Sequence, residues 1–248
     1  SLFWEKFKPL NNFLALPFWN YCFQKFPSTL TLRGQRFSQS LHADYRYRYL
    51  NYIAYFTNSM KADLYTSKFK NQVWANDTYH LIEEVFNQAN CKDKMDQTLF
   101  TDIKTILPDD YLTKVDIASM ANSLEVRAPF LDHEFMELCA RIPFNLKLKG
   151  LANKKYLLKK ALESILPRAI IYRPKRGFMI PLEHWFKGNL VSYISGLIDS
   201  KDSLTGQIFN RQYVYQLLSS HQTTAINYSN PLWAILPLEL WYRHYFGN

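Results

Sequence analysis

Apolar residues recur at helical spacing in most segments of the chain, and prolines separate these segments. The clearest helix is predicted to begin after Asp132, a good N-cap residue, and to end before Pro143. Its apolar positions follow the i, i+3, i+4, i+7 pattern of one helix face, and they are Phe135, Leu138, Cys139 and Ile142. This segment therefore predicts an amphipathic helix that packs through one side.

The same reasoning predicts helices along most of the remaining chain. The predicted helical segments are short pieces within 2–26, the span 45–56, 81–86, 99–107, a helix capped by Asp109 that runs through Met120, 153–166, 181–185, 210–219 and 230–245. In the second of these, helical spacing predicts an inward face made of Tyr45, Tyr49, Tyr52 and Phe56. Pro108 and Pro167 are expected to end helices, and Pro237 to kink the last one. No βαβ alternation and no internal repeat is found, so periodicity predicts a mainly α protein.

Composition bounds the class of protein. The 248 residues are 48% hydrophobic and 21% charged, which suits one large or two small globular domains. No apolar run approaches the roughly 18 residues of a membrane helix, and residues 1–17 carry Glu5, Lys6 and Lys8, unlike a signal peptide. Three distant cysteines and six histidines show no metal spacing. We therefore expect a cytoplasmic protein with reduced thiols, no membrane contact and no metal site.

The net charge of +9 has two interpretations. A positive field would attract an anionic partner such as a nucleotide or nucleic acid. Alternatively, the protein has a generally basic, solvated surface, which we favour because the basic residues are spread along the chain. Short clusters occur at Lys154-Lys155, Lys159-Lys160 and 173–176.

A first candidate for chemistry is the pair Glu125 and Arg127, which stands before Pro129. Proline favours an extended chain ahead of it, and two residues apart on an extended chain point to one face. A carboxylate in such a place could accept a proton as a general base. The alternative is an ordinary surface ion pair, and spacing alone favours it.

A second candidate is the basic loop of Arg173, Lys175 and Arg176, in which Gly177 lets the backbone turn. Cations held at a transferring phosphoryl group stabilise its developing charge. Without further information, a solvated basic loop is the better interpretation.

Two blocks of sequence carry a family resemblance. The first runs from Leu107 to Asp132 and ends in Leu124-Glu125-Val126-Arg127-Ala128-Pro129-Phe130-Leu131-Asp132. The second is Tyr172-Arg173-Pro174-Lys175-Arg176-Gly177-Phe178, followed by Pro181 and then Trp185-Phe186. In order and spacing they resemble the C-terminal part of the synthetase domain of glutamine-hydrolysing asparagine synthetases, with the best match over about 107–190. The resemblance implies that 1–248 are a single partial domain. Its fold would be the helical C-terminal portion of an adenine nucleotide α-hydrolase-like (ATP-pyrophosphatase) domain that lacks most of the parallel sheet.

The resemblance also implies a reaction. In that family, ATP adenylates the side-chain carboxylate of aspartate, and ammonia from a glutaminase domain then displaces AMP to give asparagine. The glutamate that matches Glu125 would act at the acyl centre, and the lysine that matches Lys175 would bind the α-phosphate and pyrophosphate. Arg173 would help to bind the nucleotide, and Arg127 would hold the loop, as would Asp132.

The sequence departs from the family pattern in two places. Ile117 stands where the family commonly has an arginine, and the chain has no two adjacent glycines. The family's Ser-Gly-Gly-x-Asp-Ser loop, which grips pyrophosphate and holds Mg²⁺, is therefore absent, and no domain with an N-terminal cysteine nucleophile is found. We expect the chain alone to be inactive and to need a companion polypeptide or upstream segment. The alternatives are a related amide-forming adenylating synthetase of a β-lactam, peptide or polysaccharide pathway and, less favoured, a basic helical module that binds nucleic acid.

Overall fold

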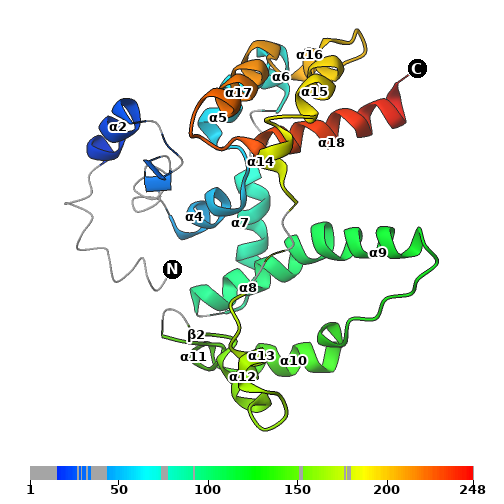
Figure 1. Ribbon diagram of the computed structural model, residues 1–248. Coiled ribbons are helices and arrows are strands. Elements are labelled where there is room, and N and C mark those ends of the chain that lie inside the picture. Colours follow the sequence, from blue (N-terminus) through cyan, green and yellow to red (C-terminus); the bar gives the residue numbers. More distant parts are fainter. Residues whose placement is uncertain are drawn as a thin grey trace. The chain divides into compact units, whose positions relative to one another are not determined.

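The computed structural model describes residues 16–26, 28, 30, 31, 33, 34, 44–73, 78–91, 93–150, 153–175, 177 and 180–247. Helices dominate this part of the chain, and its one sheet has two short strands, which confirms the mainly α prediction (Figure 1). The chain divides into two compact units, one of residues 1–6 and 80–177 and the other of residues 7–79 and 178–248. Among the described helices, none has the length and apolar character needed to span a membrane.

Unit 1 contains residues 107–177 of the segment that resembles the synthetases. Its elements are most of α7 (Thr78–Gln88), α8 (Lys94–Lys104), η2 (Leu107–Leu112), α9 (Thr113–Met120), η3 (Pro129–Leu131), α10 (His133–Arg141), α11 (Phe144–Lys147), β1 (Leu148–Lys149), β2 (Asn153–Lys154), α12 (Tyr156–Leu162) and α13 (Arg168–Ile171).

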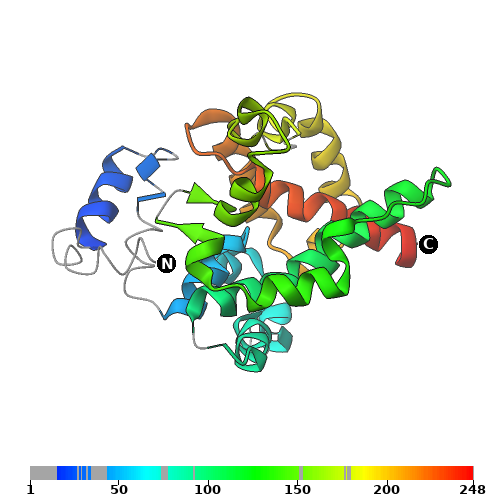
Figure 2. The ribbon, with the colours of Figure 1, turned by 90° about the horizontal axis from the view of Figure 1, so that it is seen from below.

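The helices α8 and α9 are joined by a π-helical turn, η2, and the three follow one another as a nearly continuous rod (Figures 1 and 2). The prediction that Pro108 ends a helix and that Asp109 caps the next is wrong. Proline has no backbone N–H to donate, and here the chain accommodates it in a wider, π-helical turn instead of ending the helix. The Thr113 hydroxyl donates a hydrogen bond of 2.8 Å to the Pro108 carbonyl, and the helix axis continues through this turn.

The predicted helix after Asp132 is confirmed as α10, but the expectation that it packs through its apolar face fails at Phe135, 37% exposed, and at Leu138, 59% exposed. The Asp132 carboxylate accepts the backbone N–H of Phe135 at 3.0 Å, as an N-cap does, and the helix ends at Arg141, before Pro143. Local sequence signals decide both ends of this element.

The predicted helix 153–166 is partly wrong. Asn153 belongs to β2, which pairs antiparallel with β1 in a hairpin that turns through Gly150 at φ +68°. Lys155 has a left-handed φ of 57°, so α12 can begin only after it. Pro167 ends no helix but precedes α13. The two-residue strands are too short to leave a recognisable alternation in the sequence.

Unit 2 surrounds a buried core. Its elements are α2 (Leu16–Lys25), α4 (Tyr45–Ile53), α5 (Asn58–Leu64), α6 (Ser67–Val73), α14 (Leu182–Trp185), α15 (Leu190–Asp199), α16 (Thr205–Ile208), α17 (Arg211–Thr223) and α18 (Ser229–Phe246). Phe186, Val214 and Leu232 are fully buried at the centre. The predicted inward face of 45–56 fails at Tyr52, which is 89% exposed near the end of α4.

Two buried polar groups tie the elements of unit 2 together. The Glu239 carboxylate on α18, 3% exposed, accepts hydrogen bonds from the start of α16. The fully buried His221 ring lies between two backbone groups: Nε2 is 3.0 Å from the Glu183 carbonyl and Nδ1 accepts the Tyr228 N–H at 3.0 Å. Since a carbonyl only accepts and an N–H only donates, these bonds specify the neutral Nε2–H tautomer.

Candidate functional site

Glu125 and Arg127 lie on the irregular segment between α9 and η3. An ion pair joins Arg127 Nη2 to Glu125 Oε1, so the two side chains share one face, as their spacing predicts. The Glu125 side chain is 67% exposed and that of Arg127 is 86% exposed. In this structure the carboxylate is therefore open to solvent, with one cationic partner.

Arg173 and Lys175 lie on the segment that follows α13, and both are exposed. Within the described part of the chain, no ion pair or hydrogen bond involves either side chain, and none links them to Glu125. Arg176 and Phe178 of the same predicted loop lie outside the described residues. Arg173 and Lys175 thus present two uncommitted cations to solvent.

Tyr172, the residue just before this loop, belongs to a cluster of side chains that the sequence did not predict. The Tyr172 hydroxyl donates a hydrogen bond to Glu163, which also accepts from Lys160 Nζ at 3.0 Å. Lys159 Nζ lies 5.3 Å from the centroid of the Tyr172 ring, and the guanidinium carbon of Arg168 lies 4.9 Å from it. Side chains from α12 and α13 therefore fix the start of the segment that carries Arg173 and Lys175.

The charges of this cluster perturb one another. The hydrogen bond to Glu163 raises the pKa of Tyr172, and the same bond, with that from Lys160, lowers the pKa of Glu163. Lys160 has a raised pKa because it donates to Glu163 and is attracted by its charge. A signal for this arrangement was present in the sequence, because Glu163 is the only carboxylate between residues 142 and 180.

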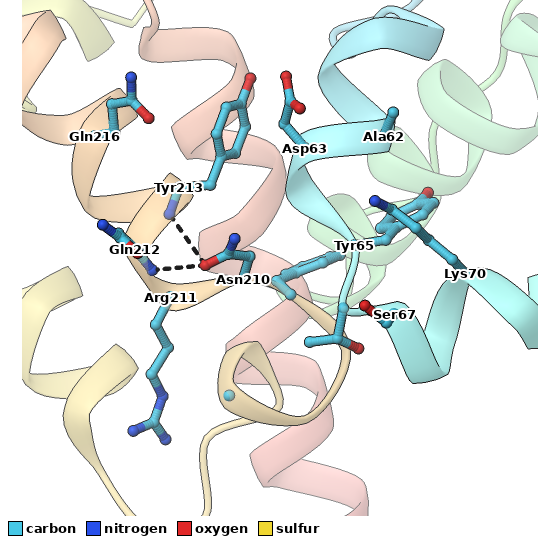
Figure 3. A pocket seen from close by; sticks show the side chains of 13 residues that line it. Ala62, Asp63, Tyr65, Ser67, Lys70, Asn210, Arg211, Gln212, Tyr213 and Gln216 are labelled. Carbon is cyan, nitrogen blue, oxygen red and sulfur yellow. Dashed lines mark hydrogen bonds between the residues drawn. The ribbon is translucent and has the colours of Figure 1, made fainter.

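Unit 2 contains a separate cavity of about 850 Å³, lined by residues of α5, α6 and α17 and their flanking segments (Figure 3). At its wall the Asn210 side chain caps α17 by accepting the backbone N–H groups of Gln212 and Tyr213. Burial, reinforced by the charge of Asp63, raises the pKa of Tyr213 to about 12. None of the sequence-predicted site residues lines this cavity.

The described residues include no group of three or more His, Cys, Asp or Glu side chains arranged to bind a metal ion. The Mg²⁺ implied by the family resemblance therefore has no ligand set in this part of the chain.

Comparison with known proteins gives a consistent result. The sequence profile of the asparagine synthase family matches residues 11–243. Asparagine synthetase [glutamine-hydrolyzing] 1 of Bacillus subtilis strain 168 is 32% identical over 195 residues, which are 79% of this chain and 30% of the relative. A putative asparagine synthetase of Mycobacterium tuberculosis H37Rv is 37% identical over 142 residues, 57% of this chain and 21% of the relative.

A vertebrate relative, the asparagine synthetase of Gallus gallus, is 34% identical over 92 residues, 35% of this chain and 16% of the relative. No solved structure matches the chain. The chain thus spans less than a third of the length of these relatives. Because the family profile extends over nearly the whole sequence, the chain belongs to the asparagine synthase family.

Proposed function

We propose that this chain supplies one wall of an adenylating amide synthetase, with Glu125, Arg173 and Lys175 as its contacts to the reactants. The observation that carries the proposal is the family match over residues 11–243, which includes both sequence blocks that hold these side chains. The substrates would be ATP and the side-chain carboxylate of aspartate, and the product asparagine.

The proposed reaction has two balanced steps. A carboxylate oxygen of aspartate bonds to the α-phosphorus of ATP, and the bond to pyrophosphate breaks. Ammonia then attacks the acyl carbon, the bond to AMP breaks, and the nitrogen loses a proton. Each step develops charge at a defined atom, and fixed charges at that atom lower the barrier.

Each proposed residue has a role that its position supports. Lys175 and Arg173 are exposed and have no carboxylate partner among the described residues, so both can approach phosphate oxygens. Glu125 offers a carboxylate to receive the proton that ammonia loses. Arg127 orients it through their ion pair.

We also propose that the chain alone does not complete this reaction. Its seven glycines are all isolated, so the family's glycine-rich phosphate loop has no counterpart in this sequence. Backbone N–H groups in such loops cradle phosphates, and single lysines do not replace them. A companion polypeptide or further segment with that loop would complete the site in the cytoplasm.

Pyrophosphate release tests the proposal. The purified chain with ATP and aspartate should show no turnover, and a family polypeptide that carries the Ser-Gly-Gly-x-Asp-Ser loop should restore it on mixing. In the restored system Lys175→Ala should reduce kcat/KM at least about a hundredfold, the scale of losing one transition-state contact.

Lys201→Ala is the matched control, because Lys201 is an exposed lysine of unit 2. Robust turnover by the chain alone would refute the proposed dependence on a companion. Full activity of the restored Lys175→Ala variant would refute the phosphate role. Replacing aspartate by other carboxylic acids in the same assay would identify an amide-forming relative with a different substrate.

A further inference from the structure

The positive charge of the protein is concentrated in one stretch of sequence. Residues 142–180 contain ten of the 30 lysines and arginines and one of the 21 acidic residues. The remaining 20 basic and 20 acidic residues cancel, so the entire net charge of +9 comes from these 39 residues. Basic residues do occur along the whole chain, as expected, but the net positive charge does not.

The described elements of this stretch, from α11 to α13, belong to unit 1. Its elements α11, β1, β2 and α12 pack together at the foot of Figure 1. Lys149 Nζ lies 3.2 Å from the Tyr156 hydroxyl, which ties the hairpin to α12, and Tyr172 ties α12 to α13 through Glu163. The charges are therefore held near one another rather than scattered over the unit.

Most of these cations are not neutralised. Within the described residues, the ion pairs of this stretch are Lys147–Asp96 and Lys160–Glu163, each at 3.0 Å. Seven described cations have no ion-pair partner in that part of the chain, and they are Lys149, Lys154, Lys155, Lys159, Arg168, Arg173 and Lys175. Only the last two belong to the proposed catalytic site.

We infer that the seven described cations named above, which we call the cationic face, capture condensed phosphate anions such as a nucleotide triphosphate and pyrophosphate. This inference rests on the proposed function, because these anions would be its substrate and product. The lysines of the hairpin and α12 act through their field, without touching the reacting atoms. They raise the local anion concentration and thereby favour delivery to Lys175.

The electrostatic field of these lysines extends far enough to attract an anion to the loop of Lys175. The Debye length is about 10 Å at 0.1 M salt, comparable to the length of the seven-residue α12. Charges on the hairpin and on α12 therefore act on an anion near the loop at low salt. Clusters of one sign can accelerate association about tenfold or more, an effect that salt removes.

The contacts favour a small condensed phosphate over nucleic acid. Single-strand binding requires free aromatic faces on which bases stack. Here Lys149 lies 4.6 Å from the Tyr156 ring centroid, and the Tyr172 ring has a cation near it from both Lys159 and Arg168. The rings are thus engaged by cations of the same stretch.

The test uses tripolyphosphate and the full chain in isothermal titration calorimetry at about 20 mM and about 300 mM salt. The test variant is Lys154→Gln with Lys155→Asn, in which asparagine tolerates the left-handed backbone at position 155. The control is Lys68→Gln with Lys201→Gln, two exposed lysines of unit 2. Both double variants lower the net charge from +9 to +7.

We expect the test variant to bind tripolyphosphate about tenfold more weakly than the wild type at low salt and less than about twofold more weakly at high salt. The control should stay within about twofold of the wild type at both. An equal effect of the two double variants would reduce the inference to a general charge effect and overturn it. Undetectable binding by the wild type would also overturn it.

The Lys175→Ala variant separates this inference from the proposed function. If it loses binding while the Lys154/Lys155 variant does not, the cationic face is refuted and the phosphate role of Lys175 stands. If only the Lys154/Lys155 variant weakens binding, the inference stands and the role of Lys175 fails. Tighter binding of an oligothymidylate than of tripolyphosphate, with the same lysine dependence, would assign the face to nucleic acid and overturn the inference.

Discussion

Replacing Glu239 should destabilise unit 2 more than any change at the candidate site. The carboxylate is 3% exposed and accepts five hydrogen bonds. Oε2 accepts from the hydroxyls of Ser203 and Thr205 and from the Thr205 backbone N–H, at 3.0–3.3 Å. Oε1 accepts from the Leu204 N–H at 3.2 Å and from Arg243 Nε at 3.0 Å.

The magnitude follows from what the substitution leaves behind. Glu239→Ala leaves Arg243 without its ion-pair partner and two N–H groups at the start of α16 without that acceptor. Removing one partner of a fully buried ion pair costs about 3–5 kcal/mol, and the 28% exposure of the Arg243 side chain places this loss at the lower end, about 3 kcal/mol. Glu239→Gln should cost about 2–4 kcal/mol, because in either orientation its NH₂ group faces donors that need an acceptor. Either loss is a large part of the 5–15 kcal/mol of a typical domain.

Urea unfolding followed by tryptophan fluorescence measures this loss, since Trp185, Trp233 and Trp241 all belong to unit 2. Thermal unfolding should show a midpoint lowered by about 10 °C, at 2–4 °C per kcal/mol for a chain of this length. The control is Glu137→Gln, which removes an exposed ion pair with Arg141 and should cost less than about 1 kcal/mol. If Glu239→Ala costs no more than this control, the network does not stabilise the fold as argued.

Two further predictions concern unit 2. His221→Ala should lower the free energy of unfolding by about 2–4 kcal/mol, because the Glu183 carbonyl and the Tyr228 N–H both lose a buried partner; a loss below about 1 kcal/mol in urea titrations would contradict this. Tyr213 has a folded-state pKa of about 12 against 10.0 for an unperturbed tyrosine, so the folded state retains the proton longer. The contribution of the protonated Tyr213 to the free energy of unfolding is full below pH 10 and is lost as the pH rises toward 12. Because Tyr213 is partly exposed, we expect this loss to be about 1–2 kcal/mol. Tyr213→Phe should lack that part of the decline between pH 10 and pH 12, and an unchanged decline would show that burial beside Asp63 does not govern it.

The parts of the fold that could be predicted are those decided by local chemistry. Asp132 caps α10 and Asn210 caps α17 because their side chains reach N–H groups two or three residues ahead. Pro108 misled the prediction because a missing N–H can be met by a wider turn as well as by a helix end. The hairpin before α12 depends on left-handed backbone at Gly150 and Lys155. Lysine rarely adopts this conformation, so the sequence gives no signal for it at position 155.

The candidate site divides in the same way. Spacing alone placed Glu125 and Arg127 on one face, and their ion pair confirms it. The contacts of Tyr172 with Glu163 and Arg168 depend on how α12 and α13 pack, which periodicity does not specify. The catalytic roles proposed for Glu125 and Lys175 rest on the family match, and the mixing assay tests them.

The exposure of the candidate residues itself constrains the mechanism. Electrostatic stabilisation of a transition state is strongest where water is excluded. Water reaches the Glu125 carboxylate in this structure, because 67% of its side chain is exposed. The neighbouring helix α9 also exposes apolar side chains, with Ile117 at 64% and Met120 at 55%. Contact sites between proteins contain exposed apolar side chains, and a partner that covers these two would remove them from water. We therefore expect the part that carries the phosphate loop to pack on α9 and to exclude water from Glu125 in doing so. Ile117→Asp should then weaken restoration of activity in the mixing assay without changing the stability of the chain alone, whereas equal restoration would place that contact elsewhere.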